Sequence, residues 1–152
     1  MHTTRRRVSK NSKTRKQKSK ASPLSSFEQE VVVKFLEMLN TIKLYHWKTH
    51  SYATHKATDK LGSELQDNVD SFVEVLLGKR GDRVNLTKIK HITLKDFDSV
   101  GKFKREIIRY KEYLVGLDNC KALKTMSNSD LYNIRDEMLS NLNQFLYLLT
   151  FK

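Results

Sequence analysis

Cysteine, proline and glycine are all scarce in this sequence of 152 residues, and each scarcity excludes a class of protein. The single cysteine, Cys120, cannot build a disulfide framework, so we expect a reducing, intracellular setting in which Cys120 is a small packing residue. One proline and five glycines are too few for the many tight turns of an all-β fold. No stretch approaches ~18 consecutive apolar residues, so we expect no transmembrane helix and no membrane partner.

Acidic side chains are absent from the first 20 residues, although the whole chain contains 17 of them. The same 20 residues supply nine of the 29 basic side chains. The remainder of the chain therefore has 20 basic and 17 acidic side chains and is nearly balanced. The nine basic residues of the N-terminal segment are Arg5, Arg6, Arg7, Lys10, Lys13, Arg15, Lys16, Lys18 and Lys20.

This basic segment has almost no apolar side chains, since only Met1 and Val8 among its first 20 residues are apolar. It cannot bury enough surface to offset its ordering entropy, so we predict a disordered tail over residues 1–24. Its cations favour binding to the phosphates of DNA or RNA without reading of the base sequence. A solvated arm, a transit peptide and a nuclear address are the other interpretations. No aromatic side chain is interleaved with the cations, so base stacking is not expected.

From residue 25 onward, apolar side chains recur at the spacing of amphipathic helices. Ser25 and Glu28 match a capping box at the start of the first helix, and residues 79–96 lack a helical period. Two long helices, a long crossover and two more helices predict an all-α, ferritin-like four-helix bundle over residues 25–152. The predicted helices span residues 26–48, 52–77, 97–116 and 129–150.

Four residues of the second predicted helix, all able to bind metals, fall on one stripe. At ~100° per residue, with His55 at 0°, Asp59 lies at about 40°, Asp70 at about 60° and Glu74 at about 100°. The apolar stripe of the same helix is roughly 120° away. We therefore expect the polar stripe to face solvent or another subunit rather than the core.

The stripe is too long for its four residues to share one metal within a single chain. At ~1.5 Å per residue, His55 and Asp70 lie ~22 Å apart along the helix. Two such helices packed antiparallel across a two-fold axis would bring His55 and Asp59 of one chain to Asp70 and Glu74 of the other, forming two equivalent sites. Imidazole and carboxylate ligands without a thiolate suit iron.

Other interpretations of this region remain. Acids and a histidine on one face of a helix are also a common solvated surface. His46 and His50 are spaced i and i+4 and could hold zinc, although no third ligand is evident. Trp47 and Tyr52 are expected to be packing residues.

The order of these residues resembles Dps, the family of DNA-binding mini-ferritins. The matching positions are His46-Trp47 in the first helix, then His55, Asp59, Asp70 and Glu74 in the second. The segment "NLNQFLYLLTF" is similar to the last helix of that family, and the likeness covers residues 27–151. The stretches "LYHWKTHSYATHKATDKL" and "DSFVEVLLGK" also resemble small Dps-like proteins of large DNA viruses.

The resemblance implies a ferroxidase centre at a dimer interface, with His46, His55, Asp59, Asp70 and Glu74 as iron ligands. It also implies a hollow dodecamer, iron(II) oxidation by hydrogen peroxide or oxygen, and DNA binding through the basic tail. The expected location is with DNA inside the cell, in a nucleoid, or in a virion or virus factory. The segment between the two family histidines is shorter here, which makes His50 a rival of His46.

Three functions follow as hypotheses. The first is a DNA-binding ferroxidase that protects DNA from oxidative damage. The second is a non-enzymatic, Dps-shaped DNA-packaging protein whose metal site is vestigial or holds zinc. The third is a helical scaffold with a localisation tail, which would neither retain DNA nor take up metal.

Overall fold

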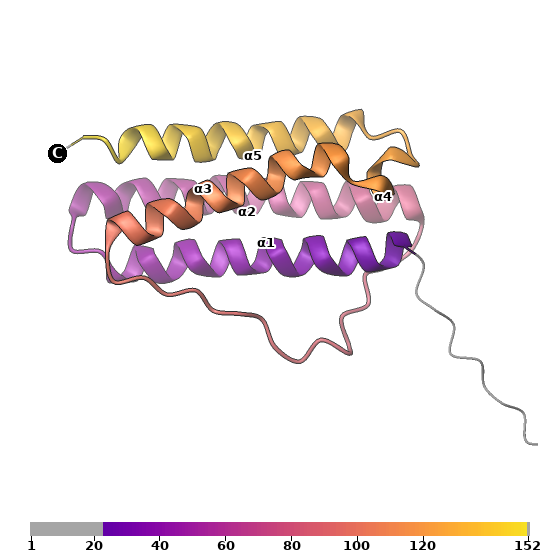
Figure 1. The fold of residues 1–152 in the computed structure, drawn as a ribbon, viewed down its shortest axis with the longest axis horizontal. Helices are drawn as coiled ribbons and strands as arrows, with labels where there is room; N and C mark the ends of the chain where they lie inside the picture. The colour runs from indigo at the N-terminus through magenta and orange to yellow at the C-terminus, as the bar shows by residue number, and fades with distance from the viewer. Residues whose placement is uncertain (1–22, 152) are drawn as a thin grey trace, which may run out of the picture.

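The structure, a computed structural model, describes residues 23–151 and is built from helices (Figure 1). Four of the helices are long, and two short helical segments join the third long helix to the fourth. The described residues contain no β-strand, so the fold is an all-α helical bundle. The elements are α1 (Pro23–Lys48), α2 (Tyr52–Arg80), α3 (Val100–Gly116), η1 (Leu117–Asn119), α4 (Lys121–Lys124) and α5 (Ser129–Leu148).

The start of α1 differs from the predicted start. The helix begins at Pro23, a residue type favoured in the first helical turn because its missing N–H would have no intrahelical partner there. Ser25 therefore lies inside the helix and is not its N-cap, and residues 23–24 belong to the bundle rather than to the tail. The rest of the predicted tail, including its nine basic residues, lies outside the described residues.

The start of α2 agrees with the sequence, but its end does not. The side chain of Ser51 accepts a hydrogen bond from the backbone N–H of Thr54, as expected of an N-cap. The helix continues through Gly78 and ends at Arg80, three residues beyond the prediction. Gly81 ends it with a left-handed φ of 67°, while its N–H donates to the carbonyl of Leu77.

The buried core consists of the apolar stripes that the helical spacing of the sequence predicted. The stripes of all four long helices meet in one cluster, in which Leu65, Phe72, Phe103, Ile107 and Leu142 are fully buried. Half-buried Cys120 packs against this cluster, which confirms the expectation that it is a packing residue.

The segment between Gly81 and Ser99 carries no helix and runs back along the length of the bundle (Figure 1). We call it the crossover. It brings the chain back to the end where α2 began, so α2 and α3 run in the same direction while α1 and α5 run in the opposite one (Figure 1). Val84, Leu86 and Phe97 attach the crossover to the core through half-buried side chains. The long crossover predicted between the second and third helices is therefore present.

No helix in the part of the chain that the structure describes is both long enough and apolar enough to cross a membrane.

Candidate metal centre

The turn between α1 and α2 brings two histidines together. Only residues 49–51 separate the helices, so the last turn of α1 lies beside the first turn of α2. The imidazole rings of His46 and His55 stack with centroids 3.9 Å apart and an interplanar angle of 25°. His46 is 8% exposed, whereas His55 is half-buried.

Backbone hydrogen bonds hold both rings in a reciprocal arrangement. Nδ1 of His46 lies 3.1 Å from the carbonyl oxygen of His55, and Nδ1 of His55 lies 3.0 Å from the carbonyl oxygen of His46. A carbonyl oxygen only accepts, so each Nδ1 must carry the proton and donate. In the neutral ring this leaves Nε2 with its lone pair, the state in which histidine binds a metal.

Thr58 supports the pair from inside the bundle. Its side chain is buried, and its Oγ1 donates to the carbonyl oxygen of Thr54 or His55, at 2.8 and 2.9 Å. The same oxygen lies 3.2 Å from Nδ1 of His46 and can accept from it. Because the hydroxyl proton is directed to a carbonyl, Thr58 favours the same tautomer of His46.

The three carboxylates of the predicted stripe are on the surface of α2. Asp59, Asp70 and Glu74 are all exposed and lie outside the core cluster, as the helical wheel predicted. Gln66 donates to Asp70 at 3.3 Å. Among residues 23–151, Asp59 and Glu74 have neither an ion pair nor a side-chain hydrogen bond. Both carboxylates are therefore free to bind a cation that approaches from solvent.

A groove of about 400 Å³ lies between α1 and α2 on this side of the bundle. Its walls include His46, Thr58 and Asp59, together with Ser63 and Gln66 further along α2. Asp70 and Glu74 are not among its lining residues, because they lie further along the helix. Within residues 23–151 of one chain, no group of three or more His, Cys, Asp or Glu side chains is placed to hold a metal ion.

The structure distinguishes the two rival histidines of α1 and the following turn. His46 contacts His55, whereas His50 is exposed and lines a separate cavity at the end of the bundle. Two aromatic residues near these histidines were expected to be packing residues, but they are not. Trp47, in the last turn of α1, and Tyr52, the first residue of α2, are 68% and 76% exposed, so neither packs in the core.

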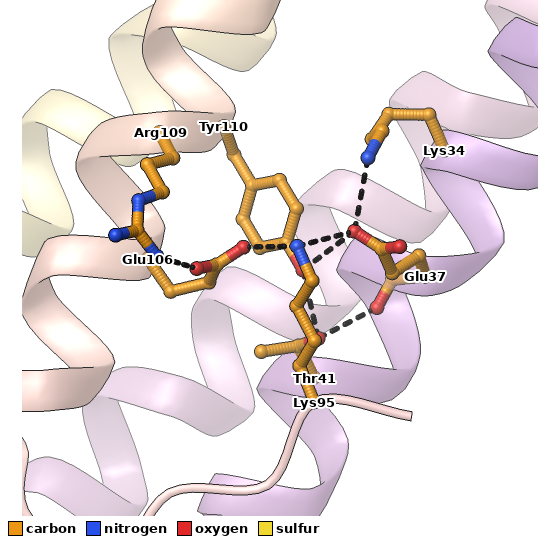
Figure 2. Close-up of polar contacts among 7 residues, drawn as sticks. All are labelled: Lys34, Glu37, Thr41, Lys95, Glu106, Arg109 and Tyr110. Carbon is orange, nitrogen blue, oxygen red and sulfur yellow. Dashed lines mark hydrogen bonds and ion pairs between the residues drawn. The ribbon is translucent and has the colours of Figure 1, made fainter. Parts of the chain in front are cut away.

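A second polar cluster, which the sequence interpretation did not identify, lies inside the bundle (Figure 2). The amine of Lys95, from the crossover, bridges two buried carboxylates, at 3.0 Å from Glu37 of α1 and 2.6 Å from Glu106 of α3. Lys34 also pairs with Glu37 at 3.1 Å, and Arg109 with Glu106 at 2.9 Å. Glu37 is 7% exposed and Glu106 is 1% exposed. The crossover thus supplies one cation that is shared by two buried carboxylates.

Hydrogen bonds and burial shift the pKa values of this cluster. Burial alone would raise the pKa of Glu37, but hydrogen bonds from Lys95 and Lys34 outweigh it and hold the pKa below its ordinary value. Burial would lower the pKa of Lys95, but its hydrogen bonds to Glu106 and Glu37 raise it overall. Burial raises the pKa of Tyr110, whose hydroxyl lies 2.8 Å from Oγ1 of Thr41.

The sequence did contain one signal for this cluster. Glu106 occupies the apolar stripe of α3, three residues after Phe103 and next to Ile107, where a solvated carboxylate is not expected. A buried carboxylate requires a cationic partner. Nothing in the sequence pointed to Lys95 as that partner, because the crossover has no period that fixes the direction of its side chains.

A search of curated proteins and a search of solved structures both gave no match. A family model, described as a family of unknown function (DUF5856), matches residues 46–149. The matched region begins at His46 and includes α2, the crossover, α3 and all of α5. Because the match covers well over half of the sequence, the chain belongs to the DUF5856 family.

Proposed function

We propose that this protein is a Dps-like mini-ferritin, which pairs through the exposed face of α2, oxidises iron(II) between the paired chains, and binds DNA through its basic N-terminal segment. The observation that carries the proposal is the arrangement on one side of the bundle. His46 and His55 are held in the metal-binding tautomer beside Asp59, and two more unburied carboxylates follow along α2.

The path of the chain supports the ferritin-like part of the proposal. A single long crossover between the second and third long helices distinguishes ferritin-like bundles from bundles with short loops throughout. Here the crossover spans the bundle and makes α2 and α3 run in the same direction (Figure 1).

The spacing on α2 supports an interface between two chains. Asp70 is fifteen residues from His55, a distance of ~22 Å along the helix axis, too far for both to bind one ion within a chain. An antiparallel pairing of two α2 helices places Asp70 and Glu74 of the second chain opposite the histidines and Asp59 of the first. Two-fold symmetry then generates the same site twice. The exposed Trp47, next to His46 in the last turn of α1, would lie near the rim of this interface.

The donor set fits iron as the substrate. Carboxylate oxygens are hard ligands that hold iron(III) as well as iron(II), and imidazole nitrogen suits iron(II). With hydrogen peroxide as oxidant, two iron(II) ions each give up one electron, the O–O bond breaks, and two protons complete two water molecules. The backbone carbonyls that accept from Nδ1 of both histidines would keep each Nε2 directed at the ion.

Iron oxidation in a stopped-flow spectrometer tests the site. Anaerobic protein loaded with iron(II) is mixed with hydrogen peroxide, and iron(III) formation is followed by absorbance. We expect Asp59→Ala and Glu74→Ala to abolish the rapid phase while the far-ultraviolet circular dichroism stays unchanged. Glu112→Gln is the matched control, because Glu112 is an exposed carboxylate on α3, away from the proposed interface.

A mixture of the two inactive variants tests whether the site spans two chains. In a mixed dimer of Asp59→Ala and Glu74→Ala, one site lacks both carboxylates and the other is intact. Random pairing of equal amounts makes about half of the dimers mixed, so about a quarter of the wild-type activity should return. No recovery after co-refolding would contradict an interchain site. Bound zinc and no oxidation in the wild-type protein would instead favour a DNA-packaging role.

A further inference from the structure

A second cavity, separate from the groove beside His46, lies at one end of the bundle. Its volume is about 680 Å³. It is bordered by the end of α1, the starts of α2 and α3, and the end of α5, near the C-terminus in Figure 1. A cavity of this size is within the range of small-molecule binding sites.

The inner walls of this end cavity are apolar. Tyr45, Ala57 and Leu149 contribute from three different helices or their ends. At its edge, Val100 and Phe151 are 47% and 61% exposed, a high exposure for large apolar side chains. Exposed apolar side chains gathered around a hollow commonly mark a place where a ligand or partner covers them.

The polar part of the end cavity is cationic. Three of its lining side chains are lysines, and the single acid, Asp98, is paired at 2.9 Å with Lys102, which does not line the cavity. Lys48 pairs with Asp96 at 2.5 Å, and Lys60 with Glu64 at 3.5 Å. Lys56 has no ion-pair partner among residues 23–151. The end cavity therefore offers an uncompensated cation beside an apolar wall.

We propose that the end cavity binds an amphipathic anion, specifically a fatty carboxylate with its chain against Leu149, Val100 and Phe151 and its head group at Lys56. The apolar walls favour a hydrocarbon chain through removal of surface from water. The lysines favour a negative head group over a neutral or positive one, because the charges lie at the edge of a low-dielectric wall. Asp59 does not line the end cavity, and the binding proposed here does not depend on iron oxidation.

Isothermal titration calorimetry of the full chain with sodium dodecanoate, below its micelle concentration, tests the proposal. We expect one dodecanoate per chain. Lys56→Glu should weaken binding about tenfold, because repulsion replaces attraction at the head group. Ala57→Trp should abolish binding by filling the end cavity. Lys104→Glu is the matched control, since it reverses an exposed charge on α3 that does not line the cavity, and it should bind dodecanoate like the wild type.

Three results would overturn the proposal. The first is equal binding of dodecyltrimethylammonium, which would show that charge plays no part. The second is unchanged dodecanoate binding in Lys56→Glu, a surface substitution that does not threaten folding. The third is absence of dodecanoate binding. If, in that case, Ala57→Trp also lowers the molecular mass measured by sedimentation, the end cavity is a contact between copies of the chain. Binding only to vesicles that contain anionic lipid, and not to free dodecanoate, would likewise refute a small-molecule site.

Discussion

Replacement of Lys95 by methionine should lower the free energy of unfolding by about 3 kcal/mol, because it leaves two buried carboxylates without their shared partner. Breaking a buried ion pair from one side costs about 3–5 kcal/mol in general. The low end applies here, since Glu37 keeps Lys34 and Glu106 keeps Arg109. Methionine preserves most of the side-chain volume, so lost packing contributes little.

Chemical denaturation followed by circular dichroism measures this loss. The matched control is Lys48→Met, which removes the ion pair between Lys48 of α1 and Asp96, the residue that follows Lys95 in the crossover. Both members of that pair are about half exposed, so its loss should cost about 0.5 kcal/mol. The triple variant Lys95→Met, Glu37→Gln, Glu106→Gln removes the buried charges together and should recover most of the lost stability. A loss below about 1 kcal/mol in Lys95→Met would refute the assignment of Lys95 as the cation that neutralises this cluster.

The pH dependence of the same difference follows from the pKa shifts. The folded pKa of Glu37 is below its ordinary value of 4.5, so its contribution is present above pH 4.5 and is lost as the pH falls through the lowered value. The folded pKa of Lys95 is above 10.5, so its contribution is present below pH 10.5 and is lost as the pH rises through the raised value. The stability difference between wild type and Lys95→Met should therefore be largest between these limits, and it should shrink as the pH falls toward the lowered pKa of Glu37 or rises toward the raised pKa of Lys95.

Three further predictions concern other parts of the chain. Thr58→Val should cost about 1 kcal/mol of stability and weaken iron(II) binding about tenfold, because His46 loses a supporting contact. Denaturation measures the loss of stability, and anaerobic titration measures the iron(II) affinity. An unchanged iron(II) affinity would contradict the supporting role of Thr58. Gly81→Ala should lower stability by about 1 kcal/mol, since alanine is strained at a φ of 67°. Gly116→Ala should not lower stability, because Gly116 has an ordinary helical φ of −59°. Equal effects of the two substitutions would contradict the assignment of Gly81 as the C-cap. Deletion of residues 2–20 should remove most DNA binding but leave iron oxidation intact. In gel shifts, the DNA affinity of the full-length protein should fall by about 0.9 log unit per log unit of salt concentration for each phosphate neutralised. An undiminished shift by the truncated protein would contradict DNA binding by the tail.

The sequence alone determined the helices and the faces that they bury. A helical repeat is a local property, so the spacing of Leu61, Leu65 and Phe72 was enough to place the core stripe of α2. The same fixed rotation per residue placed Asp59 and Glu74 on the exposed face, since their relation to the stripe depends on nothing outside the helix.

Contacts between elements were decided only by the tertiary structure. The stacking of His46 on His55 depends on how residues 49–51 turn the chain between α1 and α2. Lys95 reaches Glu37 and Glu106 because the crossover is anchored along the bundle by long-range packing. A segment without a repeating pattern has no local rule for the direction of its side chains, so only the packed bundle could bring this lysine to the two buried carboxylates.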